Sequence, residues 1–246
     1  MSIRETMPGR WVDSDDSVSN QETIENTTSI FRTMSLTMEE DKSRPPTPDG
    51  SGLPTNFHPI GPGIYRSSYP QPAHFSALKT YRFKTIITLA PDPLPVANTA
   101  FMVLTGIKHH HIAVLANKDP VVSTPAATVA RILRLMLDKR NHPMLIHCNK
   151  GKHRTGCIAA CFRKVTGWTD EACIAEYERH AAPKDRALDK LFIRRFEPPR
   201  DLKALALENG LVGGAFAQAV AGERSSRESE RTVGTALSDG SAVTVG

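Results

Sequence analysis

The stretch "MLIHCNKGKHRTGC", residues 144–157, decides the fold. It opens with a short apolar run that ends in His147 and Cys148, continues through a basic loop, and enters a helical pattern at Arg154. A short, wholly apolar strand is typical of a parallel sheet that is covered on both faces. Ligands of such sheets bind beyond the carboxyl ends of the strands, which is where this loop lies. The stretch therefore predicts an α/β domain with a binding site at Cys148.

The segments on either side alternate between strand and helix patterns. We predict strands over 63–70, 83–91, 107–115 and 143–148, and helices over 74–82, 96–106, 123–140, 154–167, 169–181 and 184–196. The helix over 123–140 has the clearest pattern, with Ser123 or Thr124 as its cap. Its apolar stripe consists of Val129, Ile132, Leu133, Met136 and Leu137. This alternation favours an α/β fold with a central, mostly parallel sheet flanked by helices.

Composition divides the chain into three parts. Residues 1–54 are rich in Ser, Thr, Glu, Asp and Pro and lack apolar periodicity, so we expect this extension to be disordered. Residues 55–200 have the size and patterning of one domain, and this domain contains the loop that follows Cys148. Residues 201–246 are expected to be a mostly disordered tail with one short helix near its start.

Positive charge is concentrated in the predicted domain. Residues 56–200 carry 22 Lys and Arg against 10 Asp and Glu, whereas both flanking segments are mildly acidic. A basic domain attracts an anionic partner, which leaves nucleic acid, an acidic membrane surface and a phosphorylated ligand open. The N-terminus lacks a signal-peptide core, no apolar run is long enough to span a membrane, and the four cysteines show no C-x-x-C spacing. We therefore expect a cytoplasmic protein, with nuclear entry left open.

The loop after the apolar strand has the features of a phosphate-binding site. Its backbone N–H groups can converge on one point, and the helix N-terminus adds unpaired donors and partial positive charge. Gly151 permits the tight turn. A thiol beside cationic groups at a helix N-terminus is substantially ionised near neutral pH, so Cys148 can attack a bound phosphoryl group and form a phosphocysteine. Arg154 can hold two phosphate oxygens, Thr155 can donate its hydroxyl to the sulfur, and His147 can orient the loop.

Other interpretations of this cysteine are open from the residues alone. A cysteine at a strand end is usually a packed core thiol. Zinc binding is disfavoured because no second Cys or His follows at ligand spacing, and the Walker phosphate loop is excluded because its G-x-x-x-x-G-K-[S/T] pattern is absent. The three consecutive histidines at 109–111 suggest a metal-binding site. Alternate residues of a strand face opposite ways and no fourth ligand is evident, so a structural role is favoured there.

The motif as a whole resembles the signature loop of a known family. The segment HCNKGKHRTG, residues 147–156, is similar to the H-C-x5-R-[S/T]-G loop of cysteine-dependent phosphatases. Its G-K-H-R-T-G ending resembles the plant and fungal atypical dual-specificity phosphatases, some of which hydrolyse inositol pyrophosphates. Segments at 56–75, 104–112, 116–121 and 183–193 resemble further motifs of that branch. The resemblance covers about 56–196 and neither tail, and it implies the dual-specificity phosphatase fold.

The resemblance implies a role for each residue of the loop. Cys148 would be the nucleophile and Arg154 the phosphate clamp, while the loop amides and a cationic rim would bind the substrate. The residues implied in binding are Asn149, Lys150, Gly151, Lys152, His153, Thr155, Lys118, Lys184 and Arg186. The general acid would be Asp119, at a point where the branch usually has Glu. Asp92, which follows another strand end, and the absence of any acid are the alternatives.

These implications define the expected activity. We expect a cysteine phosphatase that uses no metal or other cofactor and removes the β-phosphate of inositol pyrophosphates. A phosphate leaving group needs less protonation than an alkoxide, so a weak general acid is tolerable on such a substrate. A protein-tyrosine or dual-specificity phosphatase acting on phosphoproteins is the first alternative, and a phosphate-binding adaptor with weak turnover is the second. No nucleic acid partner is expected, and the tails are candidate segments for binding other proteins.

Overall fold

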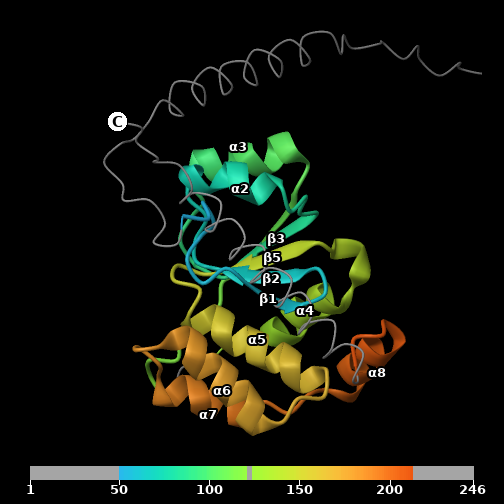
Figure 1. Ribbon diagram of the computed structural model, residues 1–246. Helices are drawn as coiled ribbons and strands as arrows, with labels where there is room; N and C mark the ends of the chain where they lie inside the picture. Colours follow the sequence, from blue (N-terminus) through green and yellow to red (C-terminus); the bar gives the residue numbers. More distant parts are fainter. Residues whose placement is uncertain (1–49, 121–123, 213–246) are drawn as a thin grey trace, which may run out of the picture. The chain divides into compact units, whose positions relative to one another are not determined.

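The computed structural model describes residues 50–120 and 124–212. A sheet of five strands with the order β1-β2-β5-β3-β4 lies at its centre (Figure 1). The strands are β1 His58–Gly61, β2 Ile64–Ser67, β3 Thr85–Thr88, β4 Lys108–His111 and β5 Met144–His147. Neighbouring strands are parallel except β1 and β2, which confirms the predicted α/β class with a mostly parallel sheet. The predictions for residues 1–49 and 213–246 lie outside the described residues.

Strand β1 is the element of the sheet that the sequence patterns did not predict. It is an edge strand that forms an antiparallel hairpin with β2, and the turn between them contains Gly63 with a φ of +70°. The register shifts between Pro59 and Gly61, as at a β-bulge. Proline is tolerated on an edge strand because its missing N–H faces away from the ladder. A four-residue strand that contains a proline has no alternation to recognise, which explains the omission.

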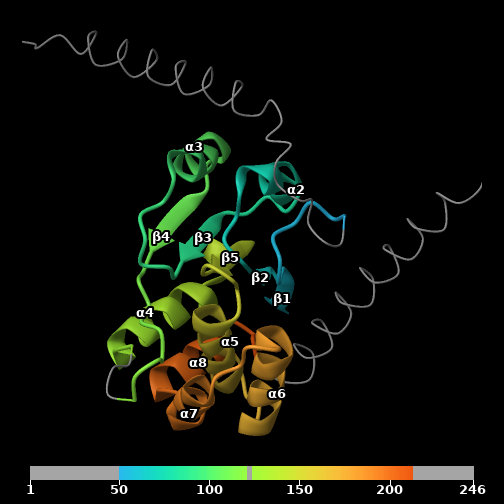
Figure 2. The same cartoon turned by 90° about the vertical axis from the view of Figure 1, so that its left-hand side faces the viewer.

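Helices cover both faces of the sheet (Figures 1 and 2). One face carries α2 Phe75–Lys79 and α3 Val96–Thr105, and the short 3-10 turn η1 Pro72–His74 leads into α2. The other face carries α4 Ala126–Leu137, α5 His153–Val165, α6 Asp170–Ala181, α7 Ala187–Arg195 and α8 Arg200–Glu208. A second 3-10 turn, η2 Lys139–Asn141, joins α4 to β5. Each element from 63 to 196 that we predicted is present, with shorter bounds.

Alternation along the strands divides the core between the two faces. Ile64 and Ile146 belong to the cluster that contains α4, α5 and α8, whereas Tyr65 and Leu145 belong to the cluster that contains α2 and α3. The predicted stripe of α4 is buried throughout. Burial of each large aliphatic side chain contributes roughly 1.5–3 kcal/mol, so the stripe fixes α4 to the sheet. Cys148 belongs to the α5 side of the core.

Two threonines near helix starts have different partners. Thr169 caps α6, since its hydroxyl oxygen accepts a hydrogen bond from the Ala172 N–H at 3.3 Å. The predicted cap of α4 is wrong for Thr124, because the helix begins at Ala126 and Thr124 Oγ1 instead accepts from the Leu115 N–H at 3.1 Å. The alternative cap, Ser123, lies outside the described residues. A long-range contact thus replaces the local one that the sequence suggested.

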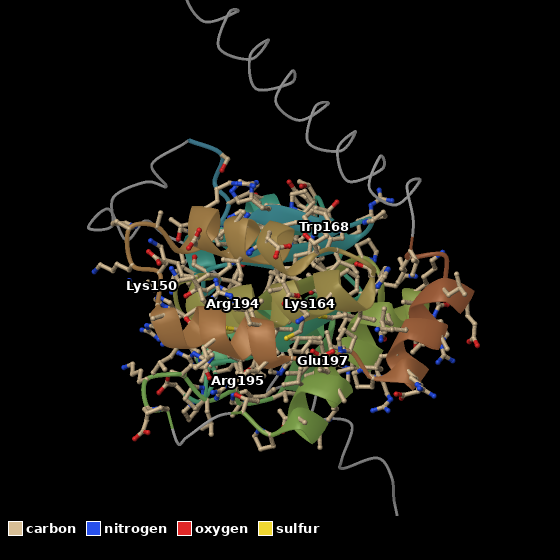
Figure 3. The ribbon with its side chains drawn as sticks, turned by 90° about the horizontal axis from the view of Figure 1, so that it is seen from below. Lys150, Lys164, Trp168, Arg194, Arg195 and Glu197 are labelled. Carbon is tan, nitrogen blue, oxygen red and sulfur yellow. The ribbon has the colours of Figure 1, made fainter. Side chains whose placement is uncertain are left out.

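The helices after the sheet are tied to one another by Lys164 on α5. Its ammonium donates to the Ile193 and Arg194 carbonyls at 3.0 and 3.3 Å, at the end of α7 (Figure 3). It also pairs with Asp170 of α6 at 2.9 Å. The next helix, α8, buries Leu202 and Ala206 in the core.

Candidate active site

Cys148 occupies the end of the central strand β5 and is 3% exposed. The loop of residues 149–152 follows, and α5 begins at His153, one residue earlier than predicted. The first N–H groups of any helix lack partners within the helix, and the helix dipole places partial positive charge there. The sulfur of Cys148 therefore lies where a strand end, a loop and a helix N-terminus meet.

Three carbonyl groups of the loop, those of residues 149–151, are turned toward the rest of the domain. The Tyr69 N–H donates to the Asn149 carbonyl at 3.2 Å, Asn56 Nδ2 donates to the Lys150 carbonyl at 3.3 Å, and Arg66 Nη2 donates to the Gly151 carbonyl at 2.7 Å. In a trans peptide the N–H points opposite to the C=O of the same unit. The N–H groups that follow these three carbonyls therefore point away from the scaffold. A row of such donors can bind an anion.

Gly151 allows this loop to lie against β2. Its φ is +66°, and a Cβ at this position would lie 2.5 Å from the Ser67 carbonyl carbon and 2.6 Å from its oxygen. No side chain fits at such distances, because the obstacle is backbone rather than a movable side chain. The predicted requirement for glycine at this turn thus has two physical causes, the positive φ and the close approach of β2.

The first turn of α5 brings Arg154 and Thr155 beside the loop. Arg154 is partly buried, and its Nη1 has one long hydrogen bond of 3.5 Å to the Leu89 carbonyl at the end of β3. Thr155 is fully buried, and its hydroxyl has no hydrogen-bond partner within residues 50–120 and 124–212. A buried hydroxyl without a partner is costly, so it is available to a group bound in the site. Both residues stand where the sequence placed them.

His147 is buried behind the loop. Its Nε2 is 2.9 Å from Thr88 Oγ1 on β3, and the same hydroxyl is 3.0 Å from His109 Nε2 on β4. The Tyr69 ring packs edge-on against it with centroids 4.9 Å apart. Burial lowers the pKa of His147 to about 3, so the ring is neutral at physiological pH. A neutral, enclosed ring fits the predicted orienting role and is unsuited to proton transfer near pH 7.

The neutral state of His147 gives a stability prediction. Because its pKa falls from 6.5 to about 3 on folding, the unfolded chain binds an extra proton between these values and stability declines as the pH falls through that window. We expect His147 to contribute up to about 1.4 kcal/mol of this decline per pH unit. Urea unfolding at pH 7, 6 and 5 should show a shallower decline for His147→Gln than for the unchanged chain. Parallel curves would contradict this assignment.

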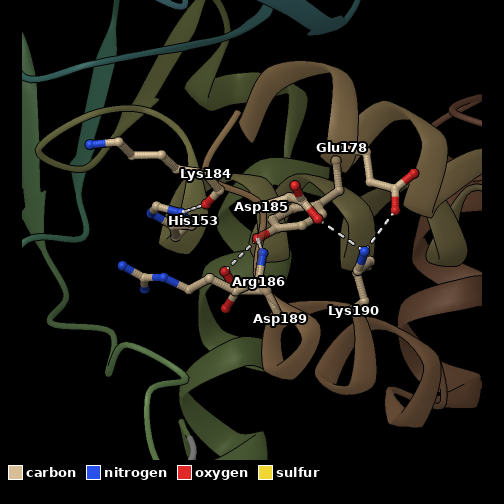
Figure 4. Close-up of polar contacts among 8 residues, drawn as sticks. His153, Glu178, Lys184, Asp185, Arg186, Asp189 and Lys190 are labelled. Carbon is tan, nitrogen blue, oxygen red and sulfur yellow. Dashed lines mark hydrogen bonds and ion pairs between the residues drawn. The ribbon is translucent and has the colours of Figure 1, made fainter. Parts of the chain in front are cut away.

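Lys152 and His153 connect the loop to the segment before α7. Lys152 Nζ donates to the Ala182 carbonyl at 2.6 Å, and His153 Nε2 is 2.6 Å from the Lys184 carbonyl (Figure 4). Figure 4 shows the side chains of Lys184 and Arg186 extending to the same side as His153, away from the ion pairs that Lys190 forms with Glu178 and Asp185. The structure therefore brings together the cations that we predicted from two separate segments, and Lys150 is exposed on the same loop.

A buried carboxylate that we did not predict as a site residue holds these segments together. Asp189 of α7 accepts from Asn117 Nδ2 at 2.9 Å and from the Tyr177 hydroxyl of α6 at 2.6 Å. The Tyr177 oxygen in turn accepts from the Arg186 N–H at 3.1 Å. Asn117 directly precedes Lys118, so the loop after β4 is anchored beside α7. The signal that could have found Asp189 is its place in the segment 183–193, which carried part of the family resemblance.

Both predicted general-acid candidates lie on exposed loops near the site. Asp119 follows Asn117 and lines a pocket of about 390 Å³ that it shares with α4 and α7. Asp92 lies after β3, and its charge acts on Tyr69, whose pKa is raised first by burial and then by this carboxylate. Since Tyr69 contacts His147 and binds the Asn149 carbonyl, Asp92 approaches the loop from the other side. The assignment of Asp119, or of Asp92 in its place, as the general acid stays a prediction.

The histidine triplet on β4 has protein partners. His111 Nε2 is 2.7 Å from the Ala90 carbonyl, and His109 is bound to Thr88 as described above. In the part of the chain that the structure describes, no three His, Cys, Asp or Glu side chains are grouped as metal ligands. The contacts of His109 and His111 accord with the structural role that we favoured.

Comparison with known proteins places this geometry in a family. The model of the tyrosine phosphatase family matches residues 53–209, which include the loop, α5 and the anchoring segments. The chain belongs to this family. Its relatives include the inositol diphosphatase DSP3 of Arabidopsis thaliana, which is 41% identical over 164 residues, covering 67% of this chain and 79% of the relative. The inositol diphosphatase SIW14 of Saccharomyces cerevisiae is 35% identical over 198 residues, covering 80% of this chain and 67% of the relative.

Solved structures agree with the assignment to the tyrosine phosphatase family. The catalytic core of Siw14 is 40% identical and superposes with a TM-score of 0.60, covering 64% of this chain and 94% of that core. A second structure is the core catalytic domain of the PP-IP phosphatase SIW14 in complex with citrate. It is 38% identical to this chain and superposes with a TM-score of 0.59. The predicted family branch and the phosphatase fold are confirmed.

Proposed function

We propose that this chain is a cysteine-dependent phosphatase that removes the β-phosphate of inositol pyrophosphates. The observation that carries the proposal is the loop after β5, whose carbonyls are bound by the rest of the domain, so that its amides are free to surround one phosphate beside Cys148. The names of the relatives, inositol diphosphatases, support the substrate class. The described residues contain no helix long and apolar enough to cross a bilayer. A cytoplasmic location and the absence of nucleic acid partners belong to this proposal.

The proposed reaction has two steps. The Cys148 thiolate attacks the β-phosphorus, the bond to the α-phosphate oxygen breaks, and the inositol phosphate leaves. Water then attacks the phosphocysteine and releases orthophosphate with the Cys148 sulfur as leaving group, to which the Thr155 hydroxyl donates. Arg154 and the loop amides hold the three phosphoryl oxygens through both transition states, where the charge on them is greatest.

The cationic rim favours a polyanionic substrate over phosphotyrosine. Lys184 and Arg186 extend to the same side as His153 of the loop, and a densely phosphorylated inositol can contact several cations at once. A phosphotyrosine pocket has aromatic walls, but the aromatic side chains of the segment 56–70 are engaged in other contacts. Phe57 and Tyr65 stack on each other at 5.5 Å within the α2 side of the core. Tyr69 packs behind the loop, so the phosphoprotein alternative gains no aromatic pocket from these residues.

Loss of a general acid should separate the substrate classes. Asp119→Ala is expected to lower kcat/KM for a phosphoester by roughly 100-fold, and for an inositol pyrophosphate by less than about tenfold, because a phosphate leaving group needs less protonation. Asp92→Ala is the matched comparison, since both carboxylates are exposed on loops near the site. Steady-state kinetics on both substrates checks this. Equal losses on the two substrates in Asp119→Ala would contradict its role, and selective loss in Asp92→Ala would transfer the role to Asp92.

The proposed function is tested by a substrate panel with the purified full chain in the presence of a chelator. The panel contains a diphosphoinositol polyphosphate, a phosphotyrosine peptide and a generic aryl phosphate. We expect the highest kcat/KM on the inositol pyrophosphate. A preference for the phosphopeptide would favour the phosphoprotein alternative, and binding without turnover of any of the three would favour the adaptor.

A further inference from the structure

Arg66 is a fully buried cation directly beneath the signature loop. It lies on β2 opposite Ile146 of β5, and the alternation along β2 directs it, like Ile64, to the α5 side of the sheet. Its exposure is 0%, and its Nη2 donates to the Gly151 carbonyl at 2.7 Å. Its Nε and Nη1 have no hydrogen-bond partner among residues 50–120 and 124–212. A buried guanidinium that uses one of its three nitrogens is costly and requires an explanation.

Among the described residues, Arg66 forms no hydrogen bond with a carboxylate. The nearby Glu176 of α6 is bound on both oxygens by Arg163 of α5, at 2.8 and 3.2 Å. Arg163 is itself 0% exposed and stacks over the Trp168 ring at 4.0 Å. Two buried guanidinium groups thus share one carboxylate. This small cluster carries an excess positive charge in a region where unpaired charge is strongly unfavourable.

Cys148 lies on the same side of the sheet as Arg66, because it belongs to the core cluster of Ile146, the residue opposite Arg66. The pKa of Arg66 falls to about 10, chiefly through burial; Glu176 and Cys148 oppose the fall, and Arg163 adds to it. Cys157 also lies nearby, but burial raises the pKa of its thiol well above the usual value, so it is uncharged near pH 7. Of the groups that act on Arg66, Cys148 is therefore the one whose ionisation can balance the excess charge.

We propose that Arg66 is a positioning residue that fixes the signature loop through Gly151 and is the buried countercharge of the Cys148 thiolate. The inference rests on the proposed function in taking Cys148 as the nucleophile, and it adds a second cation, on β2, to Arg154 on α5. Gly156 of α5 lies beside Arg66. A Cβ there would clash with the Tyr177 ring at 2.8 Å, whereas at 3.6 Å it would only be in van der Waals contact with Arg66 Nη2.

The charge role is tested by alkylation of Cys148, which requires no substrate. The rate of reaction with iodoacetamide is followed from pH 4 to 9 in the full chain and in Arg66→Met, with Cys148→Ser as the blank for the other cysteines. Loss of a close opposite charge should move the midpoint of the profile upward by roughly one pH unit or more. Arg179→Met removes an exposed arginine of α6 and controls for net charge. A profile of Arg66→Met that coincides with that of Arg179→Met would overturn the proposal.

The positioning role is tested by Arg66→Lys, which keeps the charge and loses the guanidinium geometry. We expect its alkylation midpoint to stay near that of the unchanged chain while kcat/KM falls on the order of tenfold, since a loop carbonyl loses its partner. An unchanged kcat/KM in Arg66→Lys would overturn the positioning role. This test remains possible even if Arg66→Met fails to fold. If the unchanged chain hydrolyses no inositol pyrophosphate, the proposed substrate class is wrong. The alkylation profiles would still decide whether Arg66 is the countercharge of Cys148.

Discussion

Cys148→Ser is expected to abolish turnover of every substrate, with a loss on the order of 10⁴-fold or more in kcat. The sulfur lies at the point where the loop amides and the α5 N-terminus converge, so it is placed to attack a phosphoryl group held there. A serine hydroxyl is not ionised near neutral pH, and the neighbouring His147 is not available to activate it, because its ring is enclosed and hydrogen-bonded to Thr88. Initial rates on the three substrates of the panel measure this.

Binding should survive the same substitution. The loop carbonyls remain held by Tyr69, Asn56 and Arg66, so the amides stay arranged for a phosphate. Titration of Cys148→Ser with a diphosphoinositol polyphosphate should therefore give an affinity close to the KM of the active chain. Residual turnover above the level of a buffer blank would exclude the phosphocysteine mechanism.

Gly151→Ala should have the second largest effect, a loss of about 100-fold or more in kcat/KM. The new Cβ would collide with the backbone of Ser67, so the loop must move away from β2, and a displacement of about 1 Å at the reacting centre costs on the order of 100-fold. Kinetics on the inositol pyrophosphate measures the loss, and circular dichroism verifies that the domain is folded.

Gly106→Ala separates the steric effect from backbone strain. Gly106 ends α3 with a φ of +69°, close to the +66° of Gly151, but an added Cβ there meets nothing within 4 Å. Both variants should lose about 1–2 kcal/mol of stability from the left-handed conformation, and only Gly151→Ala should lose activity. Equal activities of the two variants would show that the close approach of the loop to β2 is unimportant.

The parts of the site that the sequence revealed are those encoded locally. An apolar strand, a basic glycine-bearing loop and an amphipathic helix follow one another without interruption, so Cys148, Gly151, Arg154 and Thr155 could be placed before the structure was known. The stripe of α4 was equally readable because it repeats at the helical period. Local sequence patterns were sufficient to predict a residue's position wherever that position depends only on one element and the next element along the chain.

The parts that the sequence did not reveal depend on contacts between distant residues. Asn56 and Arg66 hold the loop across 94 and 85 residues, and Asn117 reaches Asp189 across 72. No local period marks such partners, since each depends on how strands and helices pack. The choice between Asp92 and Asp119 was undecided for the same reason: both follow strand ends, and the sheet brings both loops to the same edge.

The most direct test of the central claim is a rapid-quench experiment on an inositol pyrophosphate radiolabelled in its β-phosphate. The chain is mixed with the substrate, quenched within the first turnover, and assayed for label that remains attached to protein. If a phosphocysteine forms, label becomes attached to the active chain transiently and then decays into orthophosphate. No label should become attached to Cys148→Ser. Label that passes directly into orthophosphate without attachment, or that attaches equally to Cys148→Ser, would contradict the account.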